Sequence, residues 1–122
     1  MAEPPHFDTG AARRLLGYDV LDSGGEPLGK VHDIQVDLET GIPVWMQVGR
    51  EGMRDRYVPY ATASLMGTEQ VQISLTSDRF VRAPVVKLDK GHSLDAHGLL
   101  QRYYGFDNQV IPRPTGPIKD WP

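Results

Sequence analysis

The sequence predicts a mainly β fold: a small open or closed β-barrel of five to six strands, one C-terminal helix and an extended tail. Three observations lead to this prediction. Apolar and polar residues alternate in several short runs, which is typical of strands with one buried face. Turn-forming residues separate these runs at close spacing. Sustained helical periodicity is confined to one stretch after residue 92, which leaves no room for the interleaved helices of a doubly wound α/β fold.

The longest alternating stretch, residues 28–48, predicts a hairpin. Every second residue is apolar from Ile34 to Leu38 and again from Ile42 to Val48. The three residues between these runs, Glu-Thr-Gly, predict a tight turn. Because a hairpin alone buries too little apolar surface to be stable, other strands must close over it.

Shorter runs complete the predicted barrel. Strands are expected over residues 18–21, 57–59 and 71–75, with a last extended piece over residues 85–88. The charged stretch 49–56 is expected to be a connection, and residues 60–67 an irregular crossing. Thr76 or Ser77 is expected to cap a short helical turn that ends before Pro84.

A helix is expected with Ser93 as its N-cap and Asp95 in its first turn. Its predicted buried face has the spacing i, i+3, i+4 and i+7 and consists of Ala96, Leu99, Leu100 and Tyr103. Gly105 stands where a left-handed C-terminal cap belongs. Gly98 costs this helix about 1 kcal/mol relative to alanine, so we expect the helix to depend on docking.

Four segments are therefore expected along the chain. They are a mobile N-terminal arm (1–13), the barrel (14–88), a helix segment packed on or beside the barrel (89–106) and a Pro-rich extended tail (107–122).

Composition excludes several classes of function. The 122 residues suffice for one domain with a modest core, and the net charge of −3 gives no overall basic field for nucleic acid. The chain has no cysteine, which excludes disulfides, thiolate metal sites and cysteine nucleophiles. No secretory signal is recognisable, and no apolar run approaches the roughly 20 residues that span a bilayer. We therefore expect a cytoplasmic protein.

One stretch has the spacing of a phosphate-binding loop. Residues 24–30 match G-x-x-x-x-G-K, but Val31 stands where a hydroxyl should reach Mg²⁺. A strand follows instead of the helix whose N-terminal amides would face the phosphates. The match is therefore interpreted as a turn followed by a strand, and no cofactor is predicted.

Acid–base and metal chemistry are also not predicted. His32 and Asp33 are adjacent in a strand and so point to opposite faces, while Asp33, Gln35 and Asp37 are expected on a solvated strand face. A second cluster contains the residue types of a metal site and comprises Asp89, His92, Asp95 and His97. Its two histidines are five residues apart, which does not place them on one helical face. We predict no catalytic residue and no metal.

Trp45 is the main candidate for a contact residue. If its strand neighbours line the core, the indole either points outwards as an interface anchor or packs beneath the C-terminal helix, against Leu99, Leu100 or Tyr103. The sequence leaves both alternatives open. The predicted protein-interaction surface comprises Trp45, Gln47, Leu100 and Tyr103.

An alternative site is basic. Arg50, Arg54 and Arg56 could contact phosphates while Tyr57 stacks on a base, as in small barrels that bind single strands. The net negative charge and the interleaved acidic residues weigh against nucleic acid as a partner.

Six motifs in order resemble one family. They are G-x-x-V-x-D at residues 17–22, G-K-V-x-D-I at 29–34, a glycine-led return strand from Gly41, R-x-V-P at 56–59, a late strand at 71–73 and an ending that resembles D-x-[VI]-x-x-A-P at 78–84. Together they resemble a PRC-barrel domain over about residues 14–88, with the following helix similar to an appendage of free-standing bacterial members.

The resemblance implies a binding module. The family includes the cytoplasmic barrel of the photosynthetic reaction-centre H subunit and a barrel of a ribosome-maturation factor, which act through protein contacts. It implies a non-enzymatic adaptor or assembly module with an unidentified protein client. A homodimer is expected because small barrels must protect their free strand edges. The alternative is a nucleic-acid-associated, ribosome-linked barrel.

Overall fold

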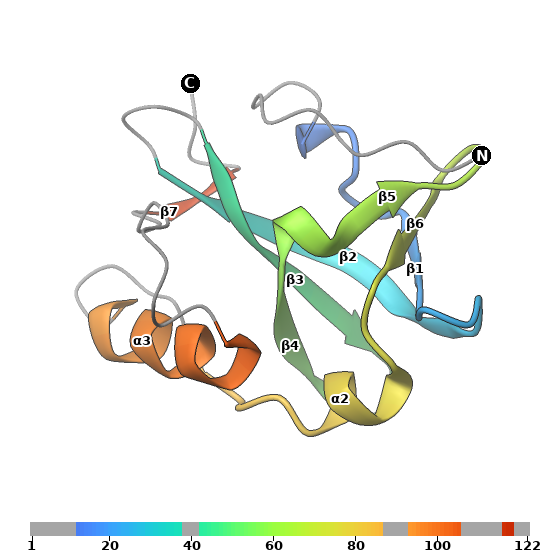
Figure 1. Ribbon diagram of the computed structural model, residues 1–122. Coiled ribbons are helices and arrows are strands. Elements are labelled where there is room, and N and C mark those ends of the chain that lie inside the picture. Colours follow the sequence, from blue (N-terminus) through green and yellow to red (C-terminus); the bar gives the residue numbers. More distant parts are fainter. Residues whose placement is uncertain (1–11, 38–41, 87–92, 106–115, 119–122) are drawn as a thin grey trace.

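A computed structural model describes residues 12–37, 42–86, 93–105 and 116–118. Its strands are β1 (Asp19–Leu21), β2 (Pro27–Val36), β3 (Pro43–Arg50), β4 (Met53–Pro59), β5 (Ala63–Leu65), β6 (Gln70–Ile73) and β7 (Gly116–Pro117). Its helices are the 3₁₀ turn η1 (Tyr60–Thr62), α2 (Ser77–Val81) and α3 (Ser93–Tyr104). The strands form one curled half-barrel in the order β4-β3-β2-β1-β6-β5, with β7 added to β2 (Figure 1). The predicted mainly β fold with a helix after the strands is confirmed.

The predicted hairpin is present as β2 and β3. Its strands pair antiparallel, with Ile34 opposite Met46 and Val31 opposite Val48. Leu38 and the expected turn lie outside the described residues. Both strands lie in the interior of the sheet, with β4 beside β3 and β1 beside β2. This position agrees with the expectation that other strands close over the hairpin.

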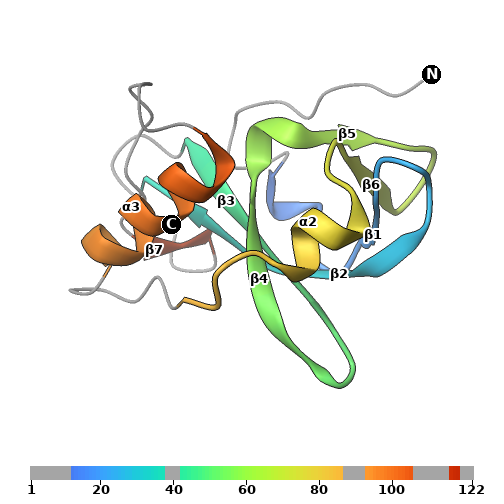
Figure 2. The same ribbon diagram turned by 60° about the horizontal axis from the view of Figure 1, so that its bottom comes forward.

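The prediction that residues 49–56 form a connection between strands is wrong. β3 continues to Arg50, residues Glu51 and Gly52 make the turn, and β4 begins at Met53. Gly52 takes a φ of 81°, a left-handed conformation that glycine adopts without steric cost. Figure 2 shows this hairpin projecting beyond the rest of the sheet. Strand residues in a projecting ribbon need no apolar alternation, because their side chains meet solvent.

The remaining strands close the half-barrel. β1 pairs antiparallel with β2 and parallel with β6, and β5 pairs antiparallel with β6. The predicted irregular crossing therefore contains a strand, β5, after the 3₁₀ turn. Thr76 caps α2 as expected, because its hydroxyl accepts the backbone N–H of Arg79. Val85 and Val86 follow α2 without joining a strand.

The β2–β3–β4 sheet is buried on both faces. Ile34, Met46 and Val58 lie side by side across the three strands and face the barrel interior. Trp45 alternates with Met46 and faces the opposite side, which α3 covers. Figure 2 shows α3 on the side of this sheet away from β1, β5 and β6.

The two terminal segments meet at β2. Ala12 is buried, and the guanidinium of Arg13 donates to the carbonyl of Ile118 at 3.2 Å. β7 pairs with Gln35 and Val36 at one end of β2. The expected arm therefore does not extend to residue 13, and residues 116–118 of the expected tail belong to the packed unit. Residues 1–11 and 106–115 lie outside the described parts.

Candidate functional site

Trp45 is buried beneath α3, which corresponds to the second of the two alternatives. Its indole N–H donates to Nδ1 of His97 at 2.8 Å, and the two rings meet edge to face. Its ring centroid lies 6.0 Å from that of Tyr104. Leu100 is also fully buried, so neither Trp45 nor Leu100 offers exposed surface in this state.

The buried stripe of α3 differs from the prediction by one helical position. Ala96, Leu100 and Tyr104 are buried, whereas Leu99 is exposed and Tyr103 half-buried. Spacings of i, i+4, i+8 and of i, i+3, i+4, i+7 both describe one helical face, so the pattern alone could not separate them. The missed residue is His97, which lies next to Ala96 on the buried side. A histidine carries no apolar signal.

Tyr103 and Tyr104 attach α3 to the rest of the molecule. The Tyr104 hydroxyl donates to the carbonyl of Tyr57 on β4. The Tyr103 hydroxyl donates to the carbonyl of Arg79 on α2, and the Arg79 guanidinium donates back to the Tyr103 carbonyl at 2.8 Å. That guanidinium also lies 5.0 Å from the Tyr103 ring centroid, a cation–π distance.

Burial changes the acid–base behaviour of this contact. It raises the pKa of Tyr104 well above the ordinary value of a phenol, and the neighbouring Tyr103 adds to the rise. The positive charges of Arg79 and Arg56 act in the opposite direction but are outweighed. The phenol therefore stays a neutral hydrogen-bond donor.

A polar chain crosses the same sheet face beyond Trp45. Nδ1 of His32 on β2 lies 2.9 Å from Oδ2 of Asp55 on β4, so the two side chains meet above the intervening strand β3. They meet over Gly49, where a Cβ would overlap the Asp55 carboxylate and lie 2.7 Å from Nδ1 of His32. Gln47 donates to the same carboxylate oxygen at 2.7 Å. The acidic partner of His32 is thus Asp55, and not its neighbour in sequence.

The prediction that Asp33, Gln35 and Asp37 lie on a solvated strand face is wrong for Asp33 and Gln35. Asp33 and Gln35 are buried, and the Asp33 carboxylate accepts the backbone N–H of Ile34 at 2.8 Å. The strand pairing shifts between Val31 and Asp33, which interrupts simple alternation. In addition, the face that carries Gln35 is the one that α3 covers.

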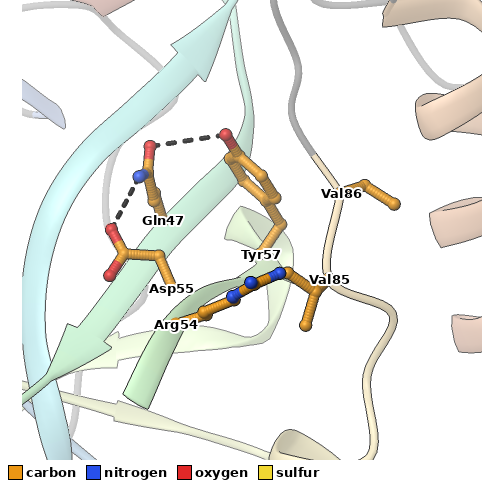
Figure 3. Close-up of a pocket in the computed structure, with 6 residues that line it drawn as sticks. All are labelled: Gln47, Arg54, Asp55, Tyr57, Val85 and Val86. Atoms are coloured by element: carbon orange, nitrogen blue, oxygen red, sulfur yellow. Dashed lines mark hydrogen bonds between the residues drawn. The ribbon is translucent and has the colours of Figure 1, made fainter. Parts of the chain in front are cut away.

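A pocket of about 480 Å³ opens beside this chain (Figure 3). Gln47, Asp55 and Tyr57 form one wall, with the Tyr57 hydroxyl 3.4 Å from the Gln47 carbonyl oxygen. Arg54 and Val85 lie on the other side, where the guanidinium extends toward the valine. Within the described residues, Arg54 makes no side-chain hydrogen bond or ion pair. The pocket could accept a group that carries negative charge beside an apolar part.

The basic candidate site is only partly accessible. Arg50 and Arg54 are exposed on the projecting hairpin, but the Arg56 guanidinium is turned back onto the Arg54 carbonyl at 2.6 Å. Tyr57 is only 6% exposed, which leaves no ring face on which a base could stack. Two arginines remain from the predicted nucleic-acid surface.

Of the sequence's metal-ligand candidates, the structure describes only the His97 side chain. No group of three or more His, Asp or Glu that could hold a metal ion occurs within the described residues. His97 is engaged by Trp45, while Asp89, His92 and the side chain of Asp95 lie outside the described part.

Residues 24–30, which match the spacing of a phosphate-binding loop, form a turn followed by the start of β2, in agreement with the interpretation from the sequence. The Asp22 carboxylate accepts the backbone N–H groups of Gly24 and Glu26, so these amides are occupied within the turn. Lys30 lies in β2 and pairs with Asp19 at 3.3 Å.

No helix in the described ranges is both long and apolar enough to cross a membrane. A comparison with curated proteins found no match. A family model, the PRC-barrel domain, matches residues 7–89, which is more than half of the sequence. With the curled half-barrel and its trailing helix, this match shows that the chain belongs to the PRC-barrel domain family.

Proposed function

We propose that this protein is a non-enzymatic protein-interaction module of the adaptor or assembly type, and that it self-associates. PRC-barrel domains are generally non-catalytic folds that serve protein contacts, which supports the first part. The second part depends on where exposed apolar side chains lie.

The observation that carries the proposal is a set of exposed apolar residues. Among the described large apolar side chains, those that are exposed are Val81 (39%), Val85 (46%) and Leu99 (43%). They all lie on α2, on α3 or on the segment after α2, and none lies on the barrel strands. We name these three residues, together with Tyr103, the α2–α3 surface. Exposed apolar groups confined to these elements favour a protein contact there.

Strand addition is a less suitable route to self-association than side-chain contact. Two outward carbonyls of β4, at the sheet edge, are already occupied: Arg56 binds that of Arg54, and Tyr104 binds that of Tyr57. Occupied edge groups discourage pairing with a strand of another chain. The predicted homodimer is therefore proposed through the α2–α3 surface. Gln47 and Tyr103 of the predicted set are accessible near it, and Trp45 and Leu100 support α3 from below.

Sedimentation equilibrium tests this proposal. We expect a reversible dimer of the native chain, and a shift to monomer when Val85→Lys and Leu99→Lys are combined, because both charges would have to be buried. The matched control is Gln70→Lys, which adds one charge on exposed β6 and should leave the association unchanged. A native chain that is monomeric at every concentration, or a double variant that associates normally, would overturn self-association.

A further inference from the structure

One of the contacts that hold α3 to the sheet, the hydrogen bond from Trp45 to His97, requires an unprotonated nitrogen. An indole N–H can only donate a hydrogen bond, so Nδ1 of His97 must accept the bond from Trp45. The remaining ring proton of the neutral imidazole is then on Nε2. Uptake of a second proton would place an N–H group on Nδ1, facing the indole N–H.

Both partners of this bond are buried. Trp45 has no exposed surface and His97 is 5% exposed. Protonation would therefore remove the hydrogen bond and also leave a positive charge in a layer largely shielded from water, where charged groups are costly. Both effects oppose the docked position of α3 and neither acts directly on the barrel interior.

We infer that α3 is a proton-sensitive cover: when His97 takes up a proton, α3 leaves the outer face of the β2–β3–β4 sheet while the barrel stays folded. The geometry of the layer supports a local release. Beneath α3 the layer contains buried polar groups, including Gln35, whose Oε1 is buried without a hydrogen-bond partner. The barrel interior on the other face is formed by apolar side chains such as Ile34, Met46 and Val58. Elements with weaker packing open first.

Among the described residues, the elements next to this layer carry other charged and titratable groups. β2 contributes Asp33 and His32, and β4 contributes Arg56 and Asp55, which is paired with His32. α2 contributes Arg79, which lies over the Tyr104 ring. Tyr104 itself is held neutral, since burial raises its pKa. Arg56 and Arg79 oppose a further positive charge at His97, as would a protonated His32, whereas the carboxylates of Asp33 and Asp55 favour it. The net effect of these groups on protonation of His97 is tested with a variant that changes His97 alone.

The release does not depend on the proposed function, but one consequence does. If the α2–α3 surface mediates self-association, release of α3 would take Leu99 and Tyr103 away from Val81 and Val85. Acidification would then dissociate the dimer. Measuring release at concentrations where the chain is monomeric separates the two claims.

The test follows the environment of Trp45 as the pH falls from about 7.5 to about 5, the range in which an ordinary histidine gains its proton. A Trp121→Phe background restricts the fluorescence to Trp45. We expect a red-shifted emission and a several-fold rise in quenching by acrylamide at the acidic end. Backbone NMR signals of residues 96–104 should move to disordered positions, while those of β2 and β3 keep their shifts.

The matched variant is His97→Gln, whose side-chain carbonyl can accept the indole N–H without titrating. It should hold α3 docked over the whole range, and His32→Gln should behave like the parent. In the parent at neutral pH, nitrogen NMR of His97 should show the tautomer with the proton on Nε2. A tautomer with the proton on Nδ1, an acid transition that persists in His97→Gln, no transition down to pH 5, or simultaneous loss of the β2 and β3 signals would each overturn the inference.

Discussion

Gly49 shows how a single missing side chain organises the polar face of the sheet. It lies on β3 between His32 on β2 and Asp55 on β4, and its lack of a Cβ lets these two side chains meet. The nearby Gly29 is similarly constrained, because a Cβ there would overlap the backbone carbonyl of Gly49. The glycines of this face are thus required by close approach and not by a turn.

Gly49→Ala should therefore destabilise the protein by about 1–3 kcal/mol, the usual cost of inserting a methyl group into a filled space. Urea unfolding at neutral pH measures the change. In an Asp55→Ala, His32→Ala background the same substitution should cost much less, because the overlapping groups are gone. Equal costs in the two backgrounds would show that the methyl group clashes with something else.

Tyr104 gives a second prediction, about pH. Burial raises its pKa in the folded protein, whereas the unfolded chain releases the phenol proton near pH 10. Below pH 10 both states hold the proton, and the contribution to stability is complete. Above pH 10 the unfolded state binds fewer protons, so stability must fall as the pH rises.

Tyr104→Phe should flatten this alkaline decline by up to about 1.4 kcal/mol per pH unit. At neutral pH the variant should lose about 1–3 kcal/mol, because the buried carbonyl of Tyr57 loses its donor. Urea unfolding at several pH values between neutrality and pH 11 measures both. Tyr18→Phe serves as the control, because it removes a phenol that lies outside α3 in the sequence. Parallel curves for Tyr104→Phe and the native chain would contradict the prediction.

For single residues, the sequence predicted which face of a strand a side chain lies on, but left open whether that face is exposed or buried. Alternation correctly placed Trp45 on the face opposite Met46, but alternation does not reveal whether a face is covered. That depends on α3, which is 52 residues away from Trp45 along the chain at His97. The same holds for Asp33 and Gln35, which look like solvent-facing residues until a helix is placed over them.

At the scale of elements, α3 is a helix whose stability comes from docking. It contains Gly98, and among the described residues the nearest group to an added Cβ there would be the Arg102 guanidinium at 3.8 Å. It ends at Tyr104, and the following Gly105 takes a φ of 80° and donates its N–H to the Arg102 carbonyl. One glycine is thus replaceable, and the other is needed for its conformation.

The same substitution at these two positions should have opposite effects. Gly98→Ala should stabilise α3 by up to about 1 kcal/mol, since alanine favours the helix and has space there. Gly105→Ala should destabilise its C-terminal end by about 1 kcal/mol, because alanine resists the left-handed conformation. Hydrogen exchange of the amides of residues 97–104 reports both changes. Effects of equal sign at the two positions would contradict this account.

Element boundaries were predictable where burial created a pattern. The β2–β3 hairpin and α2, with its Thr76 cap, follow the sequence closely. The start of β4 could not be predicted, because the projecting hairpin around Arg54 is exposed to solvent and its residues do not alternate between apolar and polar. The buried face of α3 was predicted one helical position away from the observed one. Two helical spacings are compatible with the apolar residues of this helix, and only packing against Trp45 distinguishes them.

At the scale of the whole molecule, the fold class and family were predictable because several weak motifs in a fixed order act together. What could not be predicted is how the ends of the chain join the sheet. β7 has two residues, Gly116 and Pro117, and no local pattern identifies so short a strand. Its pairing with β2 joins residues at least 80 positions apart in the sequence. The hydrogen bond from Arg13 to Ile118 joins residues 105 positions apart. Such contacts depend on the assembled barrel.

The last prediction tests whether this closure contributes to stability. Ile118 is fully buried, so Ile118→Ala should destabilise the protein by about 2–5 kcal/mol, the range for removing a large aliphatic side chain from a packed site. Arg13→Ala should cost less, about 0.5–1.5 kcal/mol, because it removes one partly buried hydrogen bond. Global urea unfolding, followed by far-ultraviolet circular dichroism, measures both. If Ile118→Ala stays within about 0.5 kcal/mol of the native chain, as surface substitutions do, packing of Ile118 after β7 adds nothing to the stability of the barrel. If it lowers stability as expected, the C-terminal segment is a structural part of the PRC-barrel fold in this protein.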